Sequence, residues 1–254
     1  MTQNTLDTSL VRTSSNTNHH IEHLSPDYPS FTHKWSGEVR KYLYTDIALP
    51  SHLDIKGKAF NDKFPVIAFA GTRSPSVECF CLVTKIATIL ASQGKTLISG
   101  GVPGVDLACH LAAFNYEECS TYAILSNPVE NGLYGHEWSN LYIENIFKKN
   151  GGFISEYKSY AELFSVEQKE RLLQRCRIIT GLSDILLVFE CSSNSATVDT
   201  AKRALLQGKK VLSIQTEKVT WRNGISQLAE EHQIEILSEK NMTINNIVEY
   251  ILRP

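Results

Sequence analysis

Three residues that suit phosphate chemistry come directly after a short apolar segment. Residues 66–70 are β-branched or apolar, and Gly71, Thr72 and Arg73 follow them, ahead of a segment with helical spacing. This pattern is typical of a buried parallel strand that ends in a tight loop and a helix start. Such a loop gathers backbone N–H groups, a hydroxyl and a guanidinium at one point, and these donors suit a phosphate group. The alternative is that the glycine only permits a tight turn.

A second loop of the same kind follows one predicted helix later. Ser99, Gly100 and Gly101 end another apolar segment, and a helical pattern starts at Asp106. Ligands of an open parallel sheet bind beyond the carboxyl ends of its strands, so two such loops on neighbouring units favour one shared anion site. Neither loop matches the GxGxxG fingerprint or the GxxxxGK[ST] motif. An ordinary dinucleotide site and a Walker-type nucleotide hydrolase are therefore disfavoured.

Two arginines mark a basic segment further along the chain. Arg175 and Arg177 flank a cysteine and form this segment together with Lys169 and Arg171. Residues two apart do not share one helix face, so we expect at least one of Arg175 and Arg177 to point outward. Two interpretations stay open: a solvated helix face, or a strip that follows the backbone of a single-stranded nucleic acid.

Hydroxyl groups begin the next predicted helix. Ser195 and Thr197 follow a predicted strand that ends at Glu190. A hydroxyl-rich helix start forms either a simple N-cap or a third phosphate-binding turn. Both interpretations remain open for these two residues.

Acidic and imidazole groups offer little for catalysis. Asp106 and His110 lie four residues apart, on the same side of one predicted helix. No Ser or Cys has nucleophile-elbow spacing, so we interpret the pair as structural or ligand-orienting. Glu156 is the best candidate for a general base or for a hydrogen bond to a ribose, but helix capping and ion pairing explain it equally well. We predict no catalytic residue.

Cysteine and histidine spacing gives no sign of a metal. The six cysteines and eight histidines show no CxxC pair and no ligand spacing, and no DxD or HExxH motif is present. We predict buried, reduced thiols, no metal and no cofactor. Reduced thiols fit the cytoplasm.

Alternating strands and helices must position these loops. We predict an α/β fold, an extended Rossmann-like doubly wound and mostly parallel sheet with helices on both faces. The predicted strands are 66–70, 96–99, 121–125, 152–155, 185–190 and 211–215. The predicted helices between and after them are 77–93, 106–114, 139–149, 166–181 and 195–207, and the chain closes with a helix at 225–231, a strand at 234–237 and a helix at 243–252.

The composition divides the chain into four parts. We expect a disordered tail over 1–24, a lead-in segment packed on the core over 25–63, the Rossmann-like domain over 64–237, and a C-terminal helix over 238–254. No apolar stretch approaches the roughly 20 residues that span a bilayer, and no signal peptide is apparent, so we expect no membrane association.

The charge is unevenly distributed. The formal net charge is −2, which argues against a general polyanion binder, yet residues 145–215 carry 11 Lys and Arg against 7 Asp and Glu. We therefore expect this sector, unlike the protein as a whole, to attract nucleic acid.

The motifs, taken together, resemble the DprA/Smf DNA-processing family in their order and spacing. The resemblance covers roughly residues 26–237 and is carried by segments 71–76, 99–110, 132–134, 151–156 and 175–183 and by the turn through Thr197. The chain departs from the family pattern at Cys176, where the family usually has asparagine between its two arginines. No winged-helix segment follows Leu252.

The resemblance implies a non-enzymatic protein that binds single-stranded DNA, self-associates as a homodimer and loads a RecA-type recombinase during natural transformation. It implies a DNA groove lined by Arg73, Ser99, Gly100, Gly101, Arg175 and Arg177. A divergent member that serves a mobile element or phage defence fits as well. The alternative is a nucleotide-sensing domain of the SLOG type or a nucleotide phosphoribohydrolase, although the PGGxGT-like loop of such enzymes is missing. A scaffold with a degenerate pocket is the third option.

Overall fold

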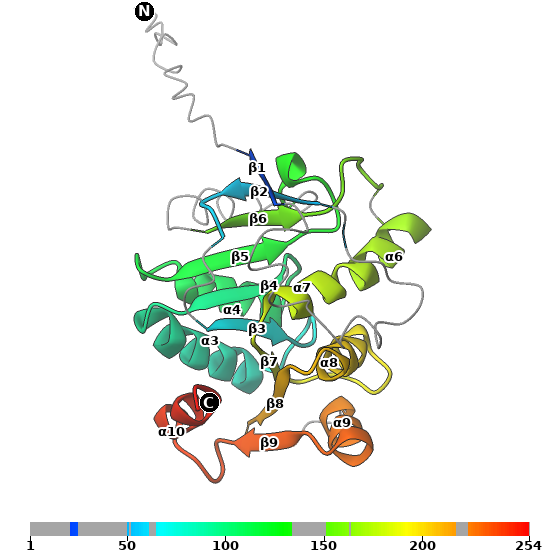
Figure 1. Ribbon diagram of the computed structural model, residues 1–254. Coiled ribbons are helices and arrows are strands. Elements are labelled where there is room, and N and C mark those ends of the chain that lie inside the picture. The colour runs from blue at the N-terminus through cyan, green and yellow to red at the C-terminus, as the bar shows by residue number, and fades with distance from the viewer. Residues whose placement is uncertain are drawn as a thin grey trace, which may run out of the picture.

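A single mixed sheet organises the chain. The computed structural model describes residues 21–24, 50, 52–60, 65–133, 151–162, 164–216 and 223–253. Their strands pair in the order β1-β2-β6-β5-β4-β3-β7-β8-β9 (Figure 1). The strands are β1 (Ile21–Leu24), β2 (Leu53–Gly57), β3 (Val66–Ala70), β4 (Thr96–Gly100), β5 (Ser120–Ile124), β6 (Gly152–Ser155), β7 (Ile185–Val188), β8 (Lys210–Gln215) and β9 (Glu235–Ser238). The helices are α3 (Val77–Ser92), α4 (Val105–Ala113), the short 3₁₀ helix η1 (Val129–Asn131), α6 (Val166–Gln174), α7 (Cys176–Leu182), α8 (Ala196–Leu206), α9 (Gly224–His232) and α10 (Ile244–Ile251).

The strand order reverses at β3. Strands β6, β5, β4, β3, β7, β8 and β9 are all parallel to one another, whereas β2 pairs antiparallel with β6 and β1 pairs antiparallel with β2. From β3 the chain first adds β4 and β5 on one side and later β7, β8 and β9 on the other. This is the doubly wound, mostly parallel sheet that the sequence predicts, and the prediction is confirmed.

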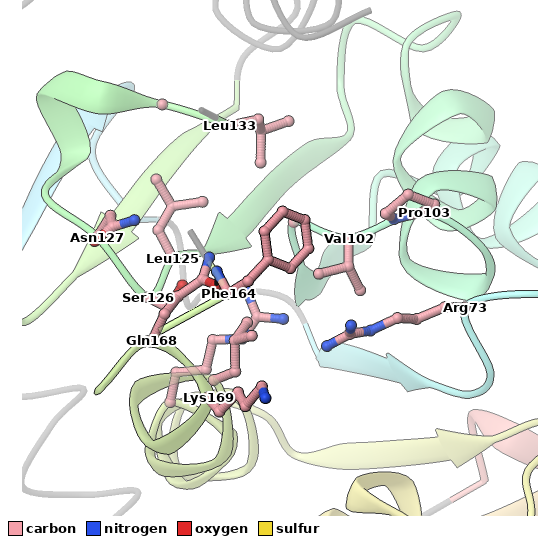
Figure 2. Close-up of a pocket in the computed structure, with 14 residues that line it drawn as sticks. Arg73, Val102, Pro103, Leu125, Ser126, Asn127, Leu133, Phe164, Gln168 and Lys169 are labelled. Atoms are coloured by element: carbon pink, nitrogen blue, oxygen red, sulfur yellow. Dashed lines mark hydrogen bonds between the residues drawn. The ribbon is translucent and has the colours of Figure 1, made fainter. Parts of the chain in front are cut away.

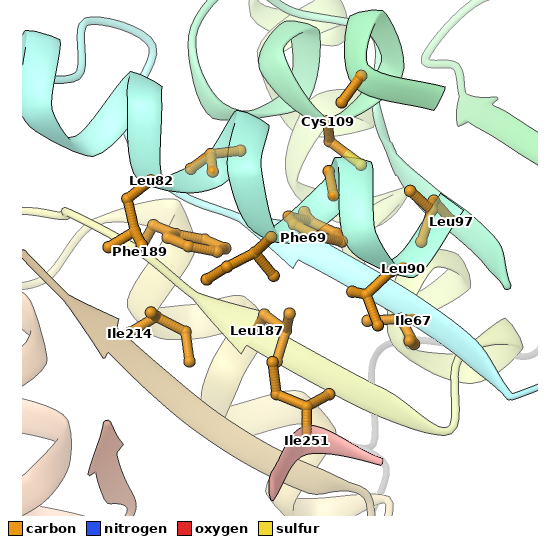
Figure 3. Close-up of a cluster of buried hydrophobic side chains, with 14 of the residues drawn as sticks. Ile67, Phe69, Leu82, Leu90, Leu97, Cys109, Leu187, Phe189, Ile214 and Ile251 are labelled. Carbon is orange, nitrogen blue, oxygen red and sulfur yellow. The ribbon is translucent and has the colours of Figure 1, made fainter. Parts of the chain in front are cut away.

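Helices cover both faces of the sheet because the strands are apolar on both sides. Ile67 and Phe69 of β3 pack with α3, α4 and α10, whereas Val66, Ala68 and Ala70 pack with α7, α8 and α9. On the first face the rings of Phe69 and Phe189 stack with their centroids 5.5 Å apart (Figure 3). Runs of buried β-branched residues suit this environment. The two layers hold the carboxyl ends of the parallel strands at one edge.

The described part of the lead-in segment, residues 50 and 52–60, contributes strand β2 to the sheet. Leu53 and Ile55 of β2 are fully buried, Phe60 packs against Tyr122, and the Tyr122 hydroxyl donates to the Ala59 carbonyl over 2.7 Å. Strand β1 at Ile21–Leu24 contradicts the prediction of a disordered tail as far as residue 24, because these residues pair with β2. Residues 1–20 and the predicted helix at 139–149 lie outside the described residues.

Two details of the sequence prediction need correction. The predicted helix over 166–181 is two helices, since α6 ends at Gln174 and α7 begins at Cys176. All six cysteines are free thiols, but Cys81 is exposed and Cys176 is half-buried, so the prediction of burial holds only for the other four. None of the described helices is both long and apolar enough to cross a membrane.

Candidate functional site

The two glycine loops pack directly against each other. The Val105 N–H, at the start of α4, donates to the Thr72 carbonyl over 3.2 Å. A side chain on Gly71 would collide with Val105, and one on Gly104 would collide with the backbone of Thr72 and Arg73. Gly104 also has a φ of 95°, a conformation that favours glycine. The structure therefore brings the loops after β3 and β4 together at one edge of the sheet, as the sequence predicts.

Glu190, which comes just after β7, anchors the loop after β3 by hydrogen bonds. Its carbonyl accepts from the Thr72 N–H over 2.8 Å, and its carboxylate accepts from the Ser76 N–H over 2.8 Å. The Ser76 hydroxyl in turn caps α3 by accepting from the Cys79 N–H. The backbone around Arg73 is therefore anchored while the Arg73 side chain is exposed.

The hydroxyl groups at the start of α8 form hydrogen bonds within the protein. Ser195 caps the helix by accepting from the Val198 N–H over 3.4 Å, and the Thr197 hydroxyl donates to the Gly71 carbonyl over 3.2 Å. The structure thus shows the capping interpretation directly. Thr197 also contributes to the wall of a cavity described below.

Arg175 and Asp106 form a buried pair behind the loops. Arg175 Nη1 donates to the Ile124 carbonyl over 2.8 Å, and Nη2 lies 3.9 Å from Asp106 Oδ2. Asp106 Oδ1 lies 2.8 Å from Ser99 Oγ. A side chain on Gly100 would collide with both charged groups, so glycine makes the pair sterically feasible. Burial raises the pKa of Asp106 and lowers the pKa of Arg175, and each opposite charge partly offsets that effect.

The Nε atom of Arg175 is a hydrogen-bond donor that lacks an acceptor. It is buried and has no hydrogen-bond partner among the described residues. Buried N–H groups in folded proteins are almost always paired. Because Arg175 lines both cavities at this edge, an acceptor of a bound ligand is a suitable partner for Nε.

His110 has a structural role, which is one of the two roles that the sequence left open. Its Nε2 lies 2.9 Å from the Gly100 carbonyl and its Nδ1 lies 2.7 Å from the Thr121 hydroxyl. Because a carbonyl only accepts, Nε2 carries the proton and Nδ1 accepts from Thr121. Complete burial lowers the pKa of His110 to about 4, so the ring is neutral near pH 7.

This environment predicts a loss of stability in mild acid. Between pH 6.5 and about 4, the unfolded chain takes up a proton at His110 that the folded chain does not, so the free energy of unfolding should fall by up to about 3 kcal/mol across that interval. The variant His110→Gln retains a donor and an acceptor but cannot titrate. Urea unfolding between pH 7 and pH 4 should show a smaller loss for the variant, and equal losses would contradict the assignment.

Arg177 lies inside the protein, in a bidentate ion pair. Its Nη1 and Nη2 donate to Glu156 Oε1 and Oε2 over 2.6 and 2.5 Å. The side chains of Arg175 and Arg177 are only 7% and 9% exposed, so the expectation that one of them points outward is wrong. Both sides of this segment are covered by other parts of the chain, so the two guanidinium groups reach different carboxylates, Asp106 for Arg175 and Glu156 for Arg177.

Arg171, in the same basic segment, also makes its contacts within the protein. It donates to the Ser159 carbonyl over 2.5 Å and to the Glu167 carboxylate over 2.5 Å, and it lies over the Tyr157 ring at 4.4 Å. These contacts join α6 to the loop that follows β6. Much of the positive charge predicted for this sector is therefore neutralised within the fold.

Two adjoining cavities occupy the edge where these loops meet. Their volumes are about 200 and 280 Å³. Both are lined by Arg73, Val102, Lys169, Leu172 and Arg175. In Figure 2 the Arg73 side chain extends from its loop toward Lys169 on α6. Arg73 makes no hydrogen bond or ion pair with any described residue, and Arg73 and Lys169 are both exposed. The nearby carboxylate of Asp106, which also lines the larger cavity, is buried and lies beside Arg175.

Sequence reasoning missed several lining residues. Ser126, Asn127 and Leu133 follow β5, and Phe164 and Gln168 lie around the start of α6. Polar residues after a strand end were a usable signal for Ser126 and Asn127. Lys169 belonged to the predicted basic segment, but no pattern distinguished it from its neighbours. In the part of the chain that the structure describes, no group of His, Cys, Asp or Glu could hold a metal ion.

The fold and site define an open α/β protein with two cavities at its strand ends, both lined by the exposed cations Arg73 and Lys169. A family model described as DNA recombination-mediator protein A matches residues 19–248, so the chain belongs to this family. The family is one of recombination mediators rather than enzymes, in agreement with the absence of a predicted catalytic residue.

Curated relatives are similar to this chain in sequence, and solved structures are similar to it in fold. Protein Smf of Borreliella burgdorferi is 27% identical over 144 residues, which are 57% of this chain and 44% of that protein. DNA processing protein A of Helicobacter pylori superposes with a TM-score of 0.67 at 20% identity and covers 91% of this chain and 95% of that one. DprA of Streptococcus pneumoniae gives a TM-score of 0.68 at 22% identity, with coverage of 92% and 75%.

These relatives set the limits of the comparison. The chain spans about half the length of the curated relatives that it matches. At 20–22% identity, the two solved structures establish the fold. The H. pylori study concerns the single-stranded DNA binding mode of that protein.

Proposed function

We propose that this protein binds single-stranded DNA at the edge formed by the loops after β3 and β4 and by α6. The observation that carries the proposal is the convergence of Arg73 and Lys169 over two adjoining cavities. Like charges held close together favour an anion between them, and a phosphodiester backbone supplies a row of such anions. The H. pylori relative, a single-stranded DNA binder, supports the same assignment.

The roles of the predicted groove residues differ under this proposal. Arg73 and Lys169 contact phosphates, and the Arg175 Nε donates to a base or phosphate oxygen. Gly71, Thr72, Ser99, Gly100 and Gly101 shape the two loops, and Arg73 extends from the first of them. Arg177 acts indirectly, through its pair with Glu156. A groove that binds the charged phosphodiester backbone of DNA needs no catalytic group.

Fluorescence anisotropy with a labelled single strand tests the proposal. We expect binding in the nanomolar to micromolar range that weakens as salt increases, with unlabelled single strand as an effective competitor. Duplex DNA and free nucleotides should compete poorly. Displacement by a mononucleotide, with little salt dependence, would instead support the nucleotide-sensing alternative.

The wider role is also a proposal. We infer that the protein acts as a homodimer that delivers single-stranded DNA to a RecA-type recombinase in the cytoplasm, in transformation or in mobile-element or phage defence. Light scattering with and without DNA tests the dimer. Strand exchange by a RecA-type recombinase, measured with and without this protein, tests delivery.

A further inference from the structure

Phe164 combines two unfavourable features at one position. Its side chain is 85% exposed, the highest exposure among the large apolar residues that the structure describes. Its backbone φ is 65°, in the left-handed region that side-chain-bearing residues rarely adopt. An exposed phenyl ring on a strained backbone gives nothing to the apolar core. Strained residues held by their surroundings concentrate at ligand sites.

The start of α6 holds Phe164 in this conformation. The Ser165 hydroxyl caps the helix by accepting from the Gln168 N–H over 3.0 Å. The Gln168 Oε1 accepts from the Phe164 N–H over 2.8 Å. These reciprocal bonds resemble a capping box and fix the chain at the entry to the helix. The ring is therefore presented by a defined turn.

The ring stands at the smaller cavity. Figure 2 shows it among the lining side chains, between Val102 and Leu125, with Arg73 and Lys169 nearby. Leu125 and Leu133 give this cavity apolar walls, and Arg175, whose buried Nε has no partner among the described residues, is another of its lining residues. A ligand that fits has a flat apolar face, a hydrogen-bond acceptor at its edge, and negative charge beside it.

A nucleobase attached to a phosphodiester backbone has all three properties. We propose that Phe164 stacks on one base of a bound single strand, while Arg73 and Lys169 contact the adjoining phosphates. This inference rests on the proposed function and adds a base contact to it. Stacking on an aromatic ring tolerates every base, because each base has a π-face. Phe164 therefore contributes affinity without strong sequence preference.

A two-by-two comparison of protein and strand isolates the stacking. Wild type and Phe164→Ala are titrated with oligo-dT and with an all-abasic strand of equal length. Loss of one stacked base should weaken oligo-dT binding by about 5- to 140-fold. The abasic strand offers no ring to stack on, so both proteins should bind it equally. The salt dependence should be the same for both proteins, because no phosphate contact changes.

Further variants separate binding from folding. Val166→Ala removes another highly exposed apolar side chain, which lines neither cavity, and should bind as the wild type does. Phe164→Trp should retain binding. Phe164→Gly should bind a single strand as weakly as Phe164→Ala does. In thermal unfolding it should be at least as stable as Phe164→Ala, because glycine tolerates a φ of 65°.

The outcomes distinguish the two proposals. If the wild type binds neither strand, the proposed function fails and the stacking role fails with it. If the wild type binds oligo-dT and Phe164→Ala binds it equally well, only the stacking role is overturned. Equal losses on oligo-dT and on the abasic strand would also overturn it, since the ring would then act without a base.

Discussion

Replacing Glu156 with alanine should destabilise the fold by about 3–5 kcal/mol, because it removes the carboxylate that binds the buried Arg177 guanidinium through two hydrogen bonds. The two side chains are 14% and 9% exposed and are joined by two short hydrogen bonds. The pair links the end of β6 to the start of α7 and so holds α6 and its Lys169 against the strand ends. Chemical denaturation of wild type and variant measures the effect.

Two controls test whether the missing counter-charge causes this loss. The double variant Glu156→Leu/Arg177→Met removes both charges and should cost less than Glu156→Ala alone. Glu167→Ala removes a carboxylate that is 60% exposed in its pair with Arg171, and should cost less than about 1 kcal/mol. A double variant less stable than Glu156→Ala would show that the pair matters through other contacts.

Local signals were sufficient to predict the frame of the site. The loops after β3 and β4 were predictable because each apolar strand ends in glycine and a helix follows directly. The parallel arrangement then requires both loops to lie at one edge. The same reasoning placed Ser195 at a helix start, where it is the N-cap of α8.

The long-range ion pairs and the unusual backbone geometry of the site could not be predicted from these local sequence signals. The partners of Arg175 and Arg177 lie on α4 and after β6, far away in sequence, and the helix break at Arg175 has no glycine or proline to mark it. Phe164 was not found because a positive φ at phenylalanine follows from the surrounding turn and not from its residue type. In both cases tertiary contacts determined which side chains are available to a ligand.

The exposed cations, rather than the buried arginines, should therefore govern DNA affinity. Arg73 and Lys169 are exposed at both cavities, whereas Arg177 is neutralised by Glu156 and Arg175 by Asp106. A cation contributes to counterion release only when it neutralises a phosphate, so only the first two should affect the salt dependence. This distinction separates direct phosphate ligands from residues that shape the site.

We expect Arg73→Ala and Lys169→Ala each to weaken binding to a single strand by about tenfold at 0.1 M salt, since each removes a charge-assisted contact. Each should also flatten the slope of log K against log salt by roughly 0.7, and the double variant by roughly 1.4. Anisotropy titrations at four or more salt concentrations measure both quantities. Arg73→Lys should recover the slope but not the full affinity if the guanidinium binds phosphate in a bidentate manner.

Matched variants make this prediction specific. Lys85→Ala removes the same charge from an exposed position on α3 that lines neither cavity, and should leave affinity and slope unchanged. Glu156→Leu/Arg177→Met should likewise keep the slope, because the pair that it removes carries no net charge. If that double variant flattens the slope while Arg73→Ala and Lys169→Ala do not, Arg177 contacts the DNA directly, and the strand then follows a path that requires the Glu156 pair to open.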